Sequence, residues 1–231
     1  EMCGIAGILS KTNSTQIIPN LLAILTNLID RGQDGTGIGY IDHQGNLVIK
    51  KKDVSALDFL EENKNEKVEC NIAIGHVRFP TVGVTSKFNS HPLLDCTSNI
   101  AVAHNGTIKN YRTLQNELTT EGHIFLSSVD SEVIPHLIEK YFEKYADLEK
   151  SIRKTIDRLE GYYTFTVISN FEPDKVYLYR HHFPLVLVKD ENTYYFSSDR
   201  SPLVKLLNKP IRAKHLKEGE LLALSYLDSF D

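Results

Sequence analysis

Apolar side chains follow two different spacings along the 231 residues of this chain. In 15–29 (TQIIPNLLAILTNLI) they recur three and four positions apart, which predicts an amphipathic helix. The runs CGIAGIL at 3–9, CNIAIGHVRF at 70–79 and IAVAHNG at 100–106 are short and almost continuously apolar. Runs of this length predict buried strands.

Glycines and polar turn residues mark the expected ends of the other elements. The glycine-dense stretch 30–39 (DRGQDGTGIG) predicts a loop, and Gln44-Gly45-Asn46 predicts a hairpin turn. Residues 53–69 are polar and predict a short helix with an exposed loop. Further helices are predicted at 108–118, 130–145 and 148–159, the last one closed by Gly161 as a C-cap.

From residue 162 onward the pattern changes to strands. Five segments carry it: YYTFTVIS, KVYLYR, PLVLVKD, TYYFSSD and GELLALSYL, with one helical turn expected at KLLNKP. The order is strand, helix, several strands, helices and again strands, which differs from an alternating βαβ pattern. We therefore expect an α+β fold in a single domain, 1–231: a four-layer αββα sandwich of two antiparallel sheets.

Composition and charge exclude several classes of function. Hydrophobic residues make up 41% of the chain and charged residues 24%, and the net charge of −4 offers no basic field for nucleic acid or for anionic membranes. The opening residues have no basic lead and only a short apolar run, so neither a signal peptide nor a membrane span is expected. A cytoplasmic protein is predicted.

The cysteines and histidines show no metal-binding spacing. The three cysteines are far apart, with no CxxC pair, and the nine histidines form no HExxH motif. The adjacent pair His181-His182 is poorly spaced for two ligands on one helical face. No metal site, no disulfide framework and no cofactor are predicted.

Cys3, close to the start of the chain, is the first candidate for chemistry. Its thiolate would be a strong nucleophile, but an unperturbed thiol with a pKa of ~8.5 is mostly protonated at neutral pH and needs a base. At a chain terminus the α-amino group, with a pKa of ~7.7–8.0, could serve as that base. A small buried cysteine without chemical function is the alternative.

Arg78 ends a predicted strand within GHVRFPT, beside a proline turn. A guanidinium group can bind a carboxylate through two parallel hydrogen bonds, which lysine cannot do. A surface arginine after an edge strand would have the same local sequence. The motif therefore offers a carboxylate-binding residue without proving one.

Asn105-Gly106 follows the strand IAVA and precedes a predicted helix. The asparagine amide and the next backbone N–H can converge as an oxyanion hole, in which each donor contributes ~2.7–4 kcal/mol of transition-state stabilisation. Asn-Gly is also the commonest hairpin turn. The helix that follows weakens the hairpin interpretation without removing it.

Asp130 lies in SSVDSE, at the start of a predicted helix. Ser128 or Asp130 could cap that helix. Alternatively, Asp130 could bind the ammonium group of an amino acid. A free amino acid is a zwitterion, so a pocket for it needs one cation and one anion, and Arg78 with Asp130 would supply them.

Taken together, these motifs resemble the class II, N-terminal-nucleophile glutamine amidotransferases. The matching segments cover nearly the whole chain: MCGIAG from Met2, RGQD with GIG from Arg31, GHVRFPT from Gly75, NSHP from Asn89, HNG from His104, DSE from Asp130, LEG from Leu159 and SSD from Ser197. GHVRFPT is most similar to glutamine phosphoribosylpyrophosphate amidotransferase, whereas NSHP and DSEVIPHL are equally similar to the glutaminase half of glucosamine-6-phosphate synthase.

The resemblance implies a fold of the αββα type and a mechanism. Cys3 would attack the glutamine side-chain amide with its own α-amine as base, and Asn105 with the Gly106 N–H would stabilise the oxyanion. Arg78 would hold the α-carboxylate and Asp130 the α-ammonium. Further roles are implied for four residues: Phe79 and Thr81 line the pocket, His91 lies near it, and Arg31 supports the strand of the nucleophile.

Two departures from the family pattern lead to further expectations. Glu1 and Met2 precede Cys3, so its nitrogen is an amide and this form is expected to be an inactive or precursor form. Full-length relatives carry a second domain that uses the ammonia, so a partner synthase subunit or a missing C-terminal synthase domain is expected. Two alternatives remain: an N-terminal-cysteine hydrolase of another amide, and a non-catalytic glutamine-binding regulatory subunit.

Overall fold

Two antiparallel sheets form the centre of the protein in the computed structural model, which describes residues 3–79 and 88–226. Neighbouring strands in both sheets run antiparallel throughout the described part. The seven-stranded sheet has the order β11 (Ala213–His215), β9 (Val186–Asp190), β10 (Thr193–Ser197), β1 (Gly4–Ser14), β4 (Cys70–Arg78), β2 (Gly35–Asp42), β3 (Leu47–Lys52). The five-stranded sheet has the order β12 (Leu221–Ser225), β8 (Lys175–His181), β7 (Gly161–Ser169), β6 (Ile100–Ile108), β5 (Leu93–Leu94).

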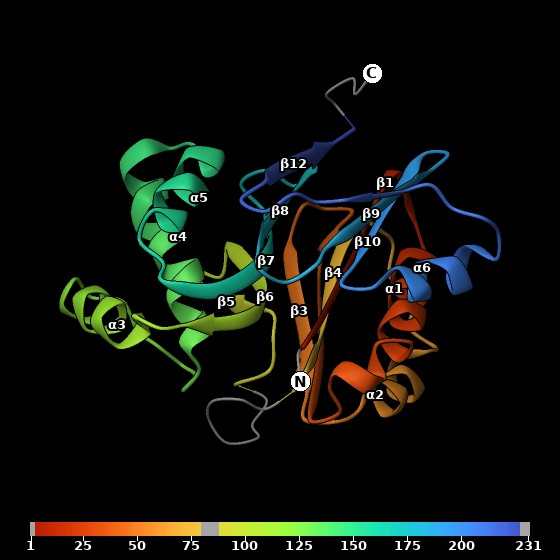
Figure 1. Cartoon of the computed structure of the whole chain (residues 1–231), viewed down its shortest axis with the longest axis horizontal. Coiled ribbons are helices and arrows are strands. Elements are labelled where there is room, and N and C mark those ends of the chain that lie inside the picture. The colour runs from red at the N-terminus through yellow and green to blue at the C-terminus, as the bar shows by residue number, and fades with distance from the viewer. Residues whose placement is uncertain (1–2, 80–87, 227–231) are drawn as a thin grey trace.

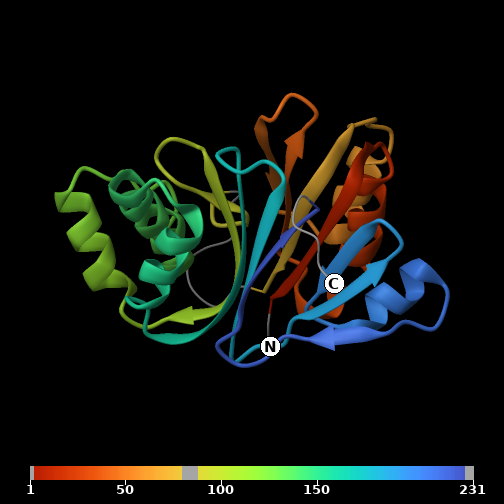
Figure 2. The same cartoon turned by 90° about the horizontal axis from the view of Figure 1, so that it is seen from above.

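Helices cover the outer face of each sheet, and Figure 2 shows the resulting layers edge-on. One outer layer consists of α1 (Ile17–Thr26), α2 (Ala56–Asn63) and α6 (Arg200–Leu207), and the other of α3 (Tyr111–Thr120), α4 (Val133–Tyr145) and α5 (Leu148–Ile156). Two short 3₁₀ turns, η1 (Ile29–Arg31) and η2 (Asp130–Glu132), complete the described elements that matter for the site. The predicted αββα sandwich is confirmed (Figure 1).

The alternation of side chains along β1 explains why this strand can lie between two cores. Ile5 and Leu9 point into the cluster between the sheets, whereas Ala6 and Ile8 pack against α1. Full burial of one aliphatic side chain of this size contributes ~1.5–3 kcal/mol. A strand that is apolar on both faces therefore belongs in the middle of the sheet, next to the equally buried β4.

Most predicted elements are confirmed, with shifted ends. The first helix, the hairpin between β2 and β3, and the polar helix α2 occur where expected. The helical turn expected at KLLNKP is the end of the longer α6, and β11 was not predicted. None of the helices in the described ranges is long and apolar enough to cross a membrane.

The prediction of a loop over 30–39 is wrong in its second half, because Gly35–Asp42 is the interior strand β2. A Cβ on Gly37 would lie 2.0 Å from the carbonyl oxygen of His91. The glycine there allows the close approach of another backbone segment rather than a turn.

Three other local predictions are also wrong. β6 continues through Asn105 and Gly106 to Ile108, because β7 pairs with it along its whole length. Gly161 begins β7 instead of capping α5. Neither Ser128 nor Asp130 caps a helix, since η2 and α4 have no side-chain cap; Asp130 accepts a hydrogen bond from the Ile108 N–H instead.

Candidate active site

Cys3 lies immediately before β1, where it meets the end of β4. Gly4 of β1 pairs with Val77 of β4, so Cys3, one residue before Gly4, lies beside the residues that follow Val77. The Phe79 N–H donates to Cys3 Sγ over 3.3 Å, and the thiol lies 3.5 Å from the Phe79 carbonyl oxygen. Burial is the main influence on the thiol and raises its pKa, against lowering effects of the Phe79 hydrogen bond and of Arg78. This thiol therefore needs a base in order to act as a nucleophile.

Arg78 is the last residue of β4 and is almost fully buried. Gly32 packs closely against the backbone of Arg78. A Cβ on Gly32 would lie only 2.3 Å from the Arg78 carbonyl carbon. The Asp34 N–H also donates to the Arg78 carbonyl over 3.3 Å. The glycine in the RGQD segment thus fixes where the β4 strand ends and where its arginine lies.

Asp130 comes from the opposite half of the molecule, at the start of η2. Its carboxylate accepts a hydrogen bond of 2.6 Å from the Ile108 N–H at the end of β6. Burial is the largest influence and raises the pKa of Asp130, while the hydrogen bonds from Ile108 and Ser131 lower it. A cationic group brought to this buried carboxylate would compensate its lost hydration.

One small cavity of about 20 Å³ brings most of the predicted site residues together. Its wall contains the residues predicted from six separate positions in the sequence: Cys3, Arg78, Phe79, His91, Gly106 and Asp130. Thr81 lies outside the described residues. A thiol, a buried cation and a buried anion therefore line one small cavity.

Asn105 and Gly106 lie next to each other in β6, at the cavity. Gly106 lines it and has a φ of 131°, and a Cβ there would lie 1.9 Å from the Tyr162 carbonyl oxygen. Asn105 does not line the cavity, but its side chain is buried and its Nδ2 has no hydrogen-bond partner within the described residues. A buried amide N–H₂ without a partner is rare, and an added acceptor would satisfy it.

Three buried histidines lie at the cavity, of which His91 and His104 line it, and the sequence assigned a site role only to His91. His91 stacks on His76, and its Nδ1 accepts a hydrogen bond from the His104 N–H over 3.0 Å. His104 Nδ1 lies 2.6 Å from Ser131 Oγ, next to Asp130. Burial lowers the pKa of His76 and of His104 to about 3 and that of His91 well below its usual value. All three rings are therefore neutral near pH 7.

Arg31 forms a paired contact with Asp199, at 2.5 Å from Nε and 2.7 Å from Nη2. The neighbouring Ser198 is joined to β1 twice, because its hydroxyl accepts from the Ile5 N–H and its own N–H donates to the Ile5 carbonyl, each over 2.9 Å. A chain of contacts thus leads from Arg31 to the strand that carries Cys3. The supporting role of Arg31 stays a prediction.

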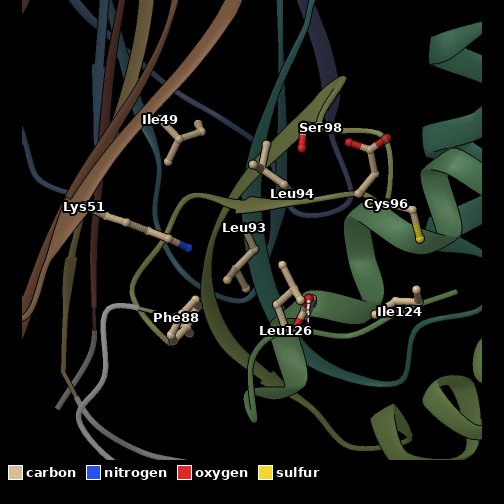
Figure 3. Close-up of a pocket in the computed structure, with 11 residues that line it drawn as sticks. Ile49, Lys51, Phe88, Leu93, Leu94, Cys96, Ser98, Ile124 and Leu126 are labelled. Carbon is tan, nitrogen blue, oxygen red and sulfur yellow. Dashed lines mark hydrogen bonds between the residues drawn. The ribbon is translucent and has the colours of Figure 1, made fainter.

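A larger cavity of about 490 Å³, which Cys3 does not line, lies between β3 and the 93–98 segment (Figure 3). Lys51 extends into it from β3 and donates to the carbonyl oxygens of Ser90 and Pro92 over 2.8 and 3.0 Å. Burial lowers the pKa of Lys51 to about 8. These contacts hold the segment that includes His91, so the lysine positions one wall of the smaller cavity.

Metal-ligating side chains gather outside the small cavity, around Cys96 and α4. The sequence did not indicate this group, because its members come from three separate segments.

A family model matches this chain and shows which protein family it belongs to. The family described as a glutamine amidotransferase domain matches residues 76–205, which is more than half of the chain. The chain belongs to the class II glutamine amidotransferases. Their shared fold accounts for the two facing sheets and for the position of Cys3 at the start of a central strand.

Several curated relatives of this amidotransferase chain share one name. Glutamine–fructose-6-phosphate aminotransferase (isomerizing) of Methanothermobacter thermautotrophicus is 37% identical over 224 residues, covering 96% of this chain and 37% of the relative. The enzyme of the same name from Sulfolobus acidocaldarius is 35% identical over 220 residues, covering 95% of this chain and 36% of the relative. The chain thus spans somewhat more than a third of the length of these relatives.

Solved structures give the same amidotransferase fold. The allosteric regulatory enzyme of purine biosynthesis matches with a TM-score of 0.84 and 27% identity, covering 97% of this chain and 47% of that one. Glutamine phosphoribosylpyrophosphate amidotransferase from B. subtilis, complexed with ADP and GMP, matches with a TM-score of 0.81 and 26% identity, covering 97% of this chain and 48% of that one.

Proposed function

We propose that this chain hydrolyses the side-chain amide of glutamine, with Cys3 as nucleophile, to give glutamate and ammonia. The observation that carries the proposal is the single cavity shared by Cys3, Arg78 and Asp130. An amide hydrolase for an apolar acyl group would need neither a buried arginine nor a buried carboxylate beside its thiol. Glutamine needs both, since it carries an α-carboxylate and an α-ammonium group.

Substrate binding follows from the two charged side chains. Arg78 binds the α-carboxylate through two parallel N–H donors. Asp130 binds the α-ammonium, and this cation lowers the raised pKa of the carboxyl group towards its usual value. Both charges are buried, so each loses hydration that only a charged partner of the opposite sign restores.

Bond formation begins when the thiol loses its proton. The neighbouring histidines are poor bases: the pKa of His104 is about 3, and the Nδ1 lone pair of His91 already accepts the His104 N–H. This favours the α-amine of Cys3 as the base, which requires that Glu1 and Met2 are absent. The thiolate then attacks the amide carbon, and the developing oxyanion receives hydrogen bonds from Asn105 Nδ2 and from the Gly106 N–H.

Turnover is completed by three proton transfers. The protonated α-amine gives its proton to the leaving nitrogen, and ammonia departs from a γ-glutamyl thioester. The α-amine, again neutral, takes a proton from the water that attacks the thioester. The carbon–sulfur bond then breaks, glutamate is released, and the Cys3 thiolate recovers the proton from the α-ammonium group. These reaction steps use only groups of the chain and one water molecule, and no cofactor takes part.

We also propose that the ammonia is passed to a synthase unit, either a separate subunit or a domain such as those that make up the rest of the relatives' length. Free ammonia is protonated in water near neutral pH and then no longer acts as a nucleophile, so a nearby acceptor site increases its yield. The name of the relatives points to fructose-6-phosphate as the acceptor. A cytoplasmic location would fit such an acceptor.

The decisive experiment compares three proteins: one that begins at Cys3, the same protein with Cys3→Ala, and one that retains Glu1 and Met2. Intact mass identifies each terminus. Glutamate release from glutamine is expected only from the first. Glutamine binding without turnover by the Cys3-first protein would favour a regulatory subunit. Turnover of other amides but not of glutamine would favour a different hydrolase, and equal activity with Glu1-Met2 attached would exclude the α-amine as base.

A further inference from the structure

Four metal-ligating side chains converge beside α4, away from the glutamine cavity. Cys96 lies in the loop after β5, His123 follows α3, and His136 and Glu139 lie one helical turn apart on α4. One potential ligand atom from each lies within 4.8 Å of all the others. None of these four residues lines the cavity that contains Cys3.

Three of the five distances between these atoms match the edges of a coordination tetrahedron, and the other two, 3.2 and 2.9 Å, are shorter. With metal–nitrogen bonds of ~2.0–2.1 Å and metal–sulfur bonds of ~2.3 Å, the ligand atoms around tetrahedral zinc lie about 3.3–3.6 Å apart. Cys96 Sγ lies 3.5 Å from His123 Nδ1 and 3.3 Å from His136 Nδ1, and the two nitrogens are 3.2 Å apart. Glu139 Oε2 lies 2.9 Å from His123 Nδ1 and 3.5 Å from His136 Nδ1.

A bound cation would use all four groups at once. Without one, only one of the two Nδ1 atoms can carry a hydrogen, because two Nδ1–H groups 3.2 Å apart would repel one another. A cation lets both Nδ1 lone pairs, the thiolate and the carboxylate point towards it. His136 and Glu139 are buried and His123 is nearly so, which places the convergence point out of bulk water.

Neighbouring groups favour the same tautomer and hold the ligands in place. If His136 Nδ1 is a ligand, its Nε2 carries the hydrogen, and this atom lies 3.5 Å from Glu132 Oε1. A carboxylate behind a ligating histidine is a common outer partner of zinc sites. The loop of Cys96 is fixed by Asp95, which accepts from the N–H groups of Asn99 and Ile100 over 2.8 and 2.7 Å.

We propose that Cys96, His123, His136 and Glu139 form a structural site for a zinc ion. A thiolate, two imidazoles and one carboxylate at tetrahedral spacing suit Zn²⁺, whereas Mg²⁺ and Ca²⁺ prefer more numerous oxygen ligands. Four protein ligands leave no open position for a substrate, so the site is structural. The ion can enter from the larger cavity, which Cys96 lines (Figure 3).

The site would connect two segments of the helical layer, the one after α3 and α4 itself, with a loop of the five-stranded sheet. Through His136 the ion is linked to Glu132, which also accepts from the N–H groups of Leu126 and Ser127 over 2.8 and 2.7 Å. Glu132 belongs to η2, the same turn that carries Asp130. Loss of the ion should therefore loosen η2 before it affects the seven-stranded sheet.

Metal binding by the full-length chain is the test, after treatment with a chelator and dialysis. One equivalent of Zn²⁺ is expected to bind and to raise the melting temperature, whereas Mg²⁺ should have no effect. Co²⁺ should give the intense visible bands of a tetrahedral site and a thiolate charge-transfer band. Cys96→Ala, at an exposed position, and His123→Ala should each weaken Zn²⁺ binding by about 100-fold or more, and Glu132→Gln by about 10- to 100-fold.

Two variants serve as controls for nonspecific binding. Cys3→Ala keeps the proposed site and removes another thiol, and His215→Ala removes an exposed histidine from β11; both should bind one equivalent with unchanged affinity. Circular dichroism shows that each variant is folded. The proposal is overturned if wild-type protein binds no stoichiometric Zn²⁺, or if folded Cys96→Ala binds it as tightly as wild type does. Loss of the cobalt charge-transfer band in Cys3→Ala but not in Cys96→Ala would also overturn it.

Discussion

The imidazole of His91 stacks on that of His76, with ring centroids 4.1 Å apart and planes inclined by 14°. His76 Nε2 donates to the His104 carbonyl oxygen over 2.9 Å, and the His104 N–H donates to His91 Nδ1. Burial is the main reason that the three rings stay uncharged in the folded protein, and the nearby cations Arg78 and Lys51 lower the pKa of His76 further. The stack therefore makes the stability of the protein depend on pH.

We expect the free energy of unfolding to fall as the pH drops below about 6.5. In the folded state the pKa of His76 and of His104 is about 3, whereas unfolded histidine has a pKa of ~6.5. Between these values only the unfolded state binds the proton, so each histidine removes ~1.4 kcal/mol of stability per pH unit. Urea unfolding at pH 7.5, 6.5 and 5.5 measures the slope. His76→Gln should reduce it by about one proton, and an unchanged slope in that variant would contradict the explanation.

Arg78→Lys should raise the KM for glutamine by about tenfold or more and change kcat much less. Lysine keeps the charge but loses the two parallel hydrogen bonds to the α-carboxylate. Steady-state kinetics of the Cys3-first protein give both constants. Arg112→Lys is the matched control, because Arg112 is exposed on α3 and its replacement should leave KM unchanged. An unchanged KM in folded Arg78→Lys protein would remove Arg78 from the substrate site.

Asn105→Ala should lower kcat by ~10²–10³-fold and affect KM much less, since it removes one of the two oxyanion donors. The corresponding change Gly106→Ala is not informative, because its Cβ would collide with the Tyr162 carbonyl oxygen. Asn116→Ala, at an exposed position of α3, is the control and should turn over normally. A variant that loses glutamine binding but keeps its turnover rate would instead place Asn105 among the substrate-binding residues.

Asp199→Asn should lower kcat by about tenfold with little change in KM. Asp199 does not line the cavity, but its pairing with Arg31 holds the 197–199 segment that is bonded to Ile5 in β1. A small displacement of the nucleophile reduces the rate without altering the charges that bind glutamine. A double-mutant cycle with Arg31→Gln measures the coupling. Fully additive effects on kcat would show that the pair does not act as a unit.

The sequence by itself determined the elements whose pattern is local. The helical spacing in 15–29, the turn at Gln44-Gly45-Asn46 and the alternating strands after residue 162 depend on neighbours within a few positions, and all three are found where expected. The candidate site residues could also be predicted, because Cys3, Arg78 and Asp130 each lie in a short motif of the sequence. The structure places all three at one cavity.

Tertiary structure alone decided features that depend on distant partners. Gly35, Gly37 and Gly39 are typical of a loop when taken locally, yet they lie in a strand because β2 pairs with β3 on one side and β4 on the other. Asn105-Gly106 reads as a turn, yet pairing with β7 extends the strand through it. The cluster around Cys96 likewise gave no signal, since its ligands are 27, 13 and 3 positions apart and meet only when a sheet loop packs against α3 and α4. Spacing along a chain fixes contacts within a helix turn or a hairpin, whereas contacts between elements are fixed by how their apolar faces are buried together.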